Sequence, residues 1–113
     1  MGLGETMSNA VDTAQFQNLA EMFFAVAGKM GQKPFTWAKK DGQWIPTRWD
    51  EAATQARALA GALRALGVKD GERVALVAEN RPEWATADVA IMAAGGISVP
   101  TYITNTVADH RHV

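Results

Sequence analysis

The chain has 113 residues, of which 48% are hydrophobic, so it is long enough and apolar enough to form one domain with a hydrophobic core. Eleven lysines and arginines oppose twelve aspartates and glutamates, and no basic run stands out, which argues against a nucleic-acid partner. There is no cysteine, so disulfides and thiolate metal sites are excluded, and a reducing cytoplasm is compatible with the composition.

The N-terminus reads MGLGETMSNAVDTAQ, without the basic start and continuous apolar core of a signal peptide, and no segment approaches the length of a membrane span. We expect residues 1–15 to be flexible and residues 16–113 to form the folded part. The first six residues also fit the loose pattern for myristoylation at Gly2. Two fixed positions match often by chance, so we favour an unmodified start.

Apolar residues at helical spacing begin near Phe16 and predict a first helix, with Asp12 or Gln15 as its cap and Gly28 and Gly31 at its end. The apolar stripe of this helix consists of Leu19, Ala20, Phe23 and Ala27. We interpret the stripe as core packing and not as a ligand-binding surface.

Two short apolar runs in PFTWAKKDGQWIPTRW flank Asp41-Gly42, the dipeptide that best tolerates positive φ in a two-residue turn, and predict a β-hairpin. Pairing Lys40 with Gln43 sets the register. This register gathers three aromatic residues on one face, namely Phe35, Trp37 and Trp44. We expect the neighbouring helix to cover this face, since stacking of exposed indoles on a base or sugar requires more assumptions.

A second helix is predicted from about Trp49 to Leu66, because apolar residues recur every three or four positions. Thr47 and Asp50 resemble a capping box, and Gly67 suits the left-handed position that follows a helix. Two arginines lie off the apolar stripe and are interpreted as solvated charges, namely Arg57 and Arg64.

The run RVALVA predicts a strand of a parallel sheet with both faces buried, RPEW to MAAGG a helix, and ISVPTY a second strand. Val74 to Pro100 thus has the length and order of a right-handed βαβ unit. In the intervening NRPEW segment, Asn80 suits the N-cap, Glu83 its N3 partner and Pro82 the first turn. A role for Arg81 in a pocket at the carboxyl end of the strand is left open.

The final residues, NTVADHRHV, predict another helix that is capped by Asn105 or Thr106. We expect further strands and helices downstream, because two parallel strands alone leave their faces and edges uncovered. His110 and His112 are interpreted as surface residues, since residues two apart on a helix point in different directions and cannot share one metal ion. Glu79 and Glu83 are interpreted as caps or solvated charges and not as an acid-base pair.

Three segments, in this order and spacing, resemble AMP-forming acyl-CoA synthetases, especially long-chain fatty-acid ligases: LGVKDGERVAL, ENRPEW and AAGGISVPTY. The resemblance covers about Leu19 to Val113. It implies an α/β fold that forms the start of the large N-terminal domain of an adenylate-forming enzyme, with an N-terminal helix, a β-hairpin, a helix and a βαβ unit, in truncated form. Residues 16–113 would then be a partial AMP-binding-type domain.

The reaction implied by this resemblance joins a fatty acid to CoA in two steps, through acyl-AMP, with release of pyrophosphate and AMP. The full-length enzyme would therefore use ATP, Mg²⁺ and CoA. The family's phosphate loop, ribose-binding Asp and catalytic Lys have no counterpart up to position 113, so no catalytic, cofactor-binding or metal-binding residue is assigned. Five lysines match none of those motifs, namely Lys29, Lys33, Lys39, Lys40 and Lys69.

We therefore expect a fragment without activity of its own, located in the cytoplasm or attached peripherally to a membrane. Its partners would be the rest of the synthetase or a second copy of the chain. One alternative is a free-standing, non-catalytic module derived from a synthetase, which binds a partner such as the remainder of a split synthetase or a synthetase subunit through its uncovered sheet edge and helices. A weaker alternative is an independent nucleotide-binding α/β domain.

Overall fold

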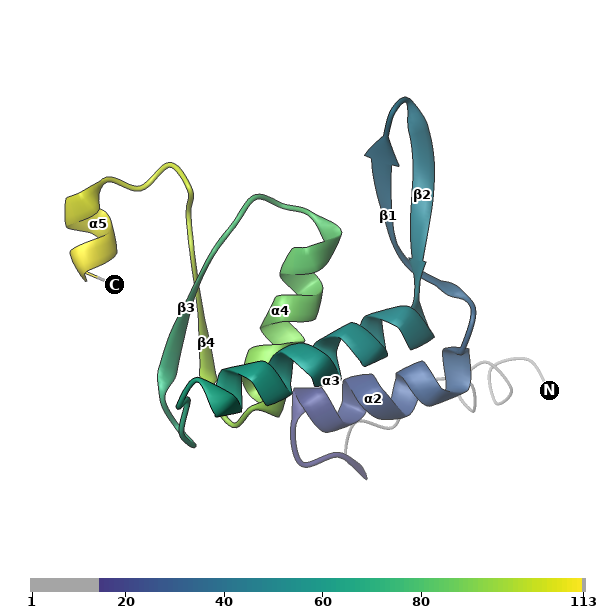
Figure 1. Cartoon of the computed structure of the whole chain (residues 1–113), viewed down its shortest axis with the longest axis horizontal. Helices are drawn as coiled ribbons and strands as arrows, with labels where there is room; N and C mark the ends of the chain where they lie inside the picture. Colours follow the sequence, from purple (N-terminus) through teal and green to yellow (C-terminus); the bar gives the residue numbers. More distant parts are fainter. Residues whose placement is uncertain (1–14, 113) are drawn as a thin grey trace, which may run out of the picture.

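The structure is a computed structural model that describes residues 15–112, so the predictions for the flexible start, for Gly2 and for a cap at Asp12 lie outside the described residues. The elements follow the predicted order (Figure 1). They are α2 (Leu19–Met30), β1 (Pro34–Lys40), β2 (Gln43–Arg48), α3 (Trp49–Ala65), β3 (Arg73–Val77), α4 (Pro82–Ala93), β4 (Ile97–Thr101) and α5 (Val107–His112).

Helix α2 is capped by Asn18, whose side-chain oxygen accepts a hydrogen bond from the N–H of Glu21 at 2.8 Å. The predicted cap at Gln15 is wrong, because Asn18 is the extended residue directly before the first turn and its short side chain reaches the free N–H. The predicted end at Gly31 is confirmed. This residue has φ of 56° and donates its N–H to the carbonyl of Ala27 at 2.9 Å.

Strands β1 and β2 form the predicted antiparallel hairpin, in which Lys40 pairs with Gln43. The turn residues Asp41 and Gly42 have φ of 52° and 80°, the positive values that a two-residue turn of this kind requires. One irregularity interrupts the register, next to Pro34 at the end far from the turn. The hairpin stands away from the helices, with only its base against them (Figure 1).

Helix α3 matches its predicted span to within one residue, but its cap is shifted. Arg48 precedes the first turn, and its N–H donates to the carboxylate of Glu51 at 3.1 Å, so Glu51 takes the role predicted for Asp50. Thr47 does not cap the helix because it still pairs with Thr36 in the hairpin ladder. The strand therefore runs directly into the helix.

The end of α3 follows the predicted glycine stop. Gly67 has φ of 106°, and the N–H of Val68 donates to the carbonyl of Leu63 at 3.1 Å, the 6→1 bond of a Schellman motif. This geometry reverses the chain toward β3.

Strands β3 and β4 are parallel and are connected by α4, as the predicted βαβ unit requires. Exposure alternates along β3, with Val74 and Leu76 half-buried and Ala75 and Val77 exposed. The prediction that both faces are buried is therefore wrong for the described residues, because α4 covers one face and no described helix covers all of the other.

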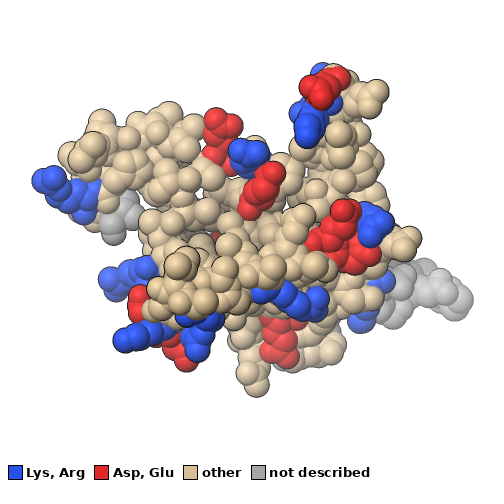
Figure 2. Space-filling view, in the orientation of Figure 1, with Lys and Arg blue, Asp and Glu red and all other residues tan. Residues whose placement is uncertain are grey.

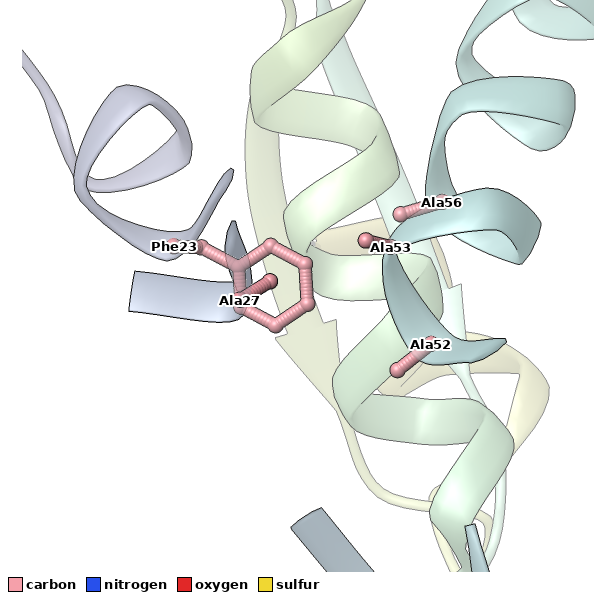
Figure 3. Packing of buried hydrophobic residues seen from close by; sticks show 5 residues of the cluster. All are labelled: Phe23, Ala27, Ala52, Ala53 and Ala56. Atoms are coloured by element: carbon pink, nitrogen blue, oxygen red, sulfur yellow. The ribbon is translucent and has the colours of Figure 1, made fainter. Parts of the chain in front are cut away.

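The main core lies between α2 and α3, with α4 against both helices. Figure 3 shows Phe23 and Ala27 of α2 facing the alanines of α3. The Phe23 ring also packs edge-on to Phe35, with centroids 5.5 Å apart, and lies 5.7 Å from Trp49. The buried residues of this cluster are Phe23, Ala27, Ala52, Ala53 and Ala56.

Arg57 and Arg64 were predicted to be solvated charges. Both side chains are exposed, but each also contacts another part of the chain. The guanidinium of Arg57 lies 4.6 Å from the centroid of the Phe24 ring, a cation–π contact between α3 and α2. Arg64 donates from one guanidinium nitrogen to the carboxylate of Asp70 at 2.8 Å and to the carbonyl of Ala94 at 3.1 Å. The longer reach of arginine explains why positions off the apolar stripe still connect helices.

A set of contacts between the C-terminal ends of α3 and α4 is here called the clasp. It consists of Arg64, Asp70, Gly71, Ala94 and Gly95. The N–H of Gly71 donates to the carbonyl of Gly95 at 2.8 Å. Gly95 has φ of 90°, and a Cβ atom there would collide with the carboxylate of Asp70. Only glycine therefore fits at this position without displacement of the loop before β3.

Replacement of Gly95 by Ala is expected to destabilise the chain by about 1–3 kcal/mol, since it combines a positive φ with the collision at Asp70. The matched control is Gly61→Ala in α3, where nothing lies within 4 Å of the added Cβ and the change should stabilise by about 0.5–1 kcal/mol. Urea unfolding followed by circular dichroism measures both. Equal effects of the two substitutions would contradict the requirement for glycine at position 95 in the clasp.

The variant Phe23→Ala should lose about 3–5 kcal/mol of unfolding free energy, because it empties the centre of the aromatic cluster. Leu66→Ala is its control, since Leu66 is 84% exposed and its truncation should change stability by only about 0.5 kcal/mol. A small loss for Phe23→Ala in the same urea titration would show that α2 is not held on α3 as described.

Candidate functional site

The NRPEW segment forms the corner between the carboxyl end of β3 and the start of α4. Arg81 is the residue before the first turn, with extended φ and ψ of −144° and 163°, and Pro82 occupies the first helical position. The predicted cap at Asn80 is wrong, and no side chain caps this helix. Pro82 sets the start one residue later, because its fixed φ suits the first turn and its missing N–H costs no helical hydrogen bond.

The charges at this corner neutralise each other. The Nε of Arg81 donates to the carboxylate of Glu83 at 2.9 Å. Hydrogen bonding to the backbone N–H of Glu83 itself, followed by the bond from Arg81, lowers the pKa of the Glu83 carboxyl below its usual range. Glu83 is therefore a carboxylate held in its ionised form at the start of α4, where the helix dipole favours negative charge. This agrees with its interpretation as a helix-start charge.

One hollow, the strand-end pocket, lies at the carboxyl ends of both parallel strands and has a volume of about 510 Å³. Its lining consists of Ala78, Glu79, Asn80, Trp84, Pro100, Thr101, Tyr102, Ile103 and Thr104. Most of these side chains are apolar or uncharged. Among the two residues predicted as helix-start charges, only Glu79 lies here, and it has no second acid beside it that could act with it in proton transfer.

A second hollow, the hairpin groove, has a volume of about 810 Å³ and lies between β1 and the first turn of α4. It shares Asn80 and Trp84 with the strand-end pocket. Arg81 lines this groove and not the strand-end pocket, so its role in a pocket at the carboxyl end of the strand stays a prediction. Figure 2 shows charged side chains at the tip of the hairpin beside this hollow.

The hairpin groove arises because the aromatic face of the hairpin is only partly covered. Phe35 packs on the core, with its ring centroid 4.3 Å from that of Trp49. Trp37 and Trp44 remain 54% and 64% exposed. The prediction that the neighbouring helix covers the whole face is wrong, because the hairpin extends beyond the end of α2. The sequence alone gave the register of these indoles but no sign of the groove.

Helix α5 carries the two histidines in a short capped turn. Thr106 is its cap, one of the two predicted, and exchanges hydrogen bonds with Asp109. The backbone N–H of Thr106, followed by its hydroxyl, lowers the pKa of Asp109. No group of three or more metal-ligating side chains occurs within residues 15–112, so His110 and His112 are not part of such a cluster.

No assembled metal site lies within residues 15–112. This part of the chain contains no group of three or more metal-ligating side chains, and the arginine at the corner is already paired with Glu83. Neither hollow brings together a nucleophile, a base and an oxyanion donor in the part of the chain from 15 to 112.

Comparison with known proteins gives one consistent family. The sequence pattern of the family described as AMP-binding enzyme matches residues 23–113. Long-chain-fatty-acid–CoA ligase FadD15 of Mycobacterium tuberculosis is 45% identical over 73 residues, which are 65% of this chain and 12% of that protein. The matched segment is thus about one eighth of that relative's length.

Solved structures agree with the sequence comparison. The fatty acyl-adenylate ligase from L. pneumophila, solved in complex with acyl adenylate and pyrophosphate, has a TM-score of 0.74 and 25% identity, and covers 82% of this chain and 16% of its own. The acetoacetyl-CoA synthetase from Streptomyces lividans has a TM-score of 0.70 and 32% identity, over 76% of this chain and 14% of its own. These matches confirm the resemblance predicted from three short segments.

A match over residues 23–113 spans most of the chain, and the fold agrees with it. The chain belongs to the AMP-binding enzyme family, and its sequence and fold match the N-terminal part of AMP-forming acyl-CoA synthetases.

Proposed function

We propose that this chain serves as the N-terminal portion of a long-chain fatty-acid CoA ligase, an enzyme that converts a fatty acid, ATP and CoA into acyl-CoA, AMP and pyrophosphate. The observation that carries the proposal is the 45% identity to a long-chain-fatty-acid–CoA ligase within the family match. The acyl adenylate and pyrophosphate bound to the L. pneumophila relative support ATP as a substrate of the whole enzyme. Mg²⁺ and CoA belong to the same proposal.

Within such an enzyme, this portion would be a scaffold. Within residues 15–112 there is no group of three or more metal-ligating side chains, and the hollows are lined mainly by uncharged side chains. Transition-state stabilisation in phosphoryl chemistry requires fixed donors and cations around the transferring group. The chain of 113 residues is therefore proposed to be inactive alone, with residues 1–15 as a flexible start and residues 16–113 as a partial AMP-binding-type domain.

A cytoplasmic location, or peripheral attachment to a membrane, is part of this proposal. Within residues 15–112, the helices are too short or too polar to cross a bilayer. Attachment would therefore have to occur through a surface and not through a span in this part of the chain.

The alternative function is a non-catalytic module that binds a partner. It is supported by the exposed face of the β3–β4 sheet, where Ile97 is 51% exposed and Val77 is 49% exposed. Exposed apolar patches of this kind mark interaction surfaces. The alternative differs from the main proposal in that the chain would be a separate polypeptide that binds a partner, and not the N-terminal portion of a ligase chain.

The isolated chain is expected to show no fatty-acid-dependent exchange of pyrophosphate into ATP and no acyl-CoA formation with Mg²⁺ and CoA present. Radiolabel exchange and chromatography of acyl-CoA measure both half-reactions, with an intact ligase such as FadD15 as the positive control. Turnover above background by the purified 113-residue chain would refute the scaffold role.

A chimera tests the main proposal against the alternative. In this chimera, the present chain replaces the matching segment of the M. tuberculosis ligase, and we expect acyl-CoA synthesis within roughly tenfold of the parent, because the fold is shared and the catalytic groups lie outside the exchanged part. Gly95→Ala in the chimera should lower its thermal stability. A folded but inactive chimera would favour the partner-binding module.

A further inference from the structure

The tripeptide Lys-Asp-Gly occurs twice in the chain, each time in a tight turn. Lys40-Asp41-Gly42 forms the tip of the β-hairpin, and Lys69-Asp70-Gly71 leads into β3. The glycine has a positive φ in both turns, 80° at Gly42 and 79° at Gly71. The two sites therefore share their local sequence and their glycine conformation, and they differ in the contacts that surround them.

An aspartate followed by glycine rearranges without an enzyme or a cofactor. The glycine nitrogen attacks the aspartate Cγ, the new N–C bond closes a five-membered succinimide, and one carboxyl oxygen leaves as water. Water then reopens the ring, at the side-chain carbonyl to restore aspartate or at the main-chain carbonyl to give isoaspartate. The water that is released is taken up again, so the net reaction is an isomerisation. Glycine favours ring closure because it has no Cβ atom to obstruct the attack.

The clasp restrains both reacting groups at the second site. The carboxylate of Asp70 accepts a hydrogen bond from the Arg64 guanidinium at 2.8 Å and lies against Gly95. The N–H of Gly71 donates to the carbonyl of Gly95 at 2.8 Å. Solvent exclusion adds no protection, since the Asp70 side chain is 86% exposed. Closure of the ring at this site therefore requires that the hydrogen bonds of the clasp open first.

The same groups are free at the hairpin tip. Within residues 15–112, Asp41 forms no ion pair and the N–H of Gly42 donates no hydrogen bond. Both residues are exposed, and the tip stands away from the helices (Figure 1). Loop tips of this kind open locally at a small cost in free energy. Ring closure at Asp41 thus has fewer contacts to break than ring closure at Asp70.

We propose that Asp41-Gly42 is a site of spontaneous isoaspartate formation in the folded protein, and that the clasp suppresses the same reaction at Asp70-Gly71. Isoaspartate at position 41 lengthens the main chain by one carbon within a two-residue turn. Such a turn sets the pairing of the strands that it joins, so the Lys40–Gln43 pair is lost. Lys40 and Trp44 line the hairpin groove, so the modification also alters that groove as the molecule ages. The inference does not depend on the proposed function.

Peptide mapping of the aged 113-residue chain tests the proposal. The chain is incubated at physiological temperature and neutral pH, and electron-transfer fragmentation then distinguishes isoaspartate from aspartate at each site. Isoaspartate should form at Asp41 roughly tenfold or more faster than at Asp70, because the clasp must open before Asp70 reacts. Equal rates, a faster rate at Asp70, or no isoaspartate at Asp41 would overturn the inference.

The repeated tripeptide supplies an internal control. In concentrated urea the two rates should converge, because the unfolded chain retains only the local sequence, which the sites share. A difference that persists in urea would assign the selectivity to the sequence and refute the protective role of the clasp.

Arg64→Ala should raise isoaspartate formation at Asp70 and leave the rate at Asp41 unchanged, since it removes the hydrogen bond to the Asp70 carboxylate. Arg57→Ala is the matched control, because this arginine of the same helix contacts Phe24 instead. Equal rates at Asp70 in the two variants would refute the protection.

Hydrogen exchange gives a second measurement on the unaltered chain. The amide of Gly71 should exchange more slowly than that of Gly42, and the reverse order would overturn the proposal even if a variant fails to fold.

Discussion

The close approach of α3 to its neighbouring helices is the constraint on which the rest of the structure depends. Ala52 and Ala56 are fully buried on α3, and Ala90 is fully buried on α4. Methyl side chains allow helix backbones to lie near each other, so a few larger residues can fill the remaining space. Phe23 does this on one side of α3. The core is small, and each element outside it is oriented by how it leaves one of these helices.

The ends of the helices set the positions of the strands that are joined to them. At one end of α3, the strand β2 continues directly into the helix at Arg48, and the hairpin stands steeply inclined to the helix axis (Figure 1). At the other end, the glycine stop and the clasp of Arg64 with Asp70 and Ala94 hold the start of β3 beside the end of α4. The βαβ unit is thereby fixed to the other helices both by the apolar packing of α4 on α3 and α2 and by these directional hydrogen bonds.

The same arrangement explains where apolar surface remains exposed. The α4 side of the β3–β4 sheet is covered, while the opposite side shows Ala75 and Val77, and the outer part of the hairpin shows two indoles. Burial of large aromatic groups contributes strongly to stability, so sequences rarely leave two of them exposed on one element without a contact for them. In a family whose members are several times longer, such surfaces are the natural places for the rest of the fold to pack.

The amino-acid sequence was sufficient to predict the order and kind of the elements, the hairpin register, the glycine stops and the family. These features depend on local geometry. Asp41-Gly42 accepts positive φ, Gly67 ends a helix, and the spacing of apolar residues indicates whether a segment is a helix or a strand. The cap residues were predicted less accurately, because the residue before each helix, Asn18 or Arg48, depends on where the preceding segment ends.

Packing between segments remote in sequence sets which charged residues make contacts and which apolar residues stay exposed. Arg64 reaches a carbonyl 30 residues away, and Arg57 lies over an aromatic ring of another helix. The hairpin groove exists because the tip of the hairpin extends past the helix that covers its base. Contacts of this kind depend on distances between segments remote in sequence, which neither composition nor periodicity contains.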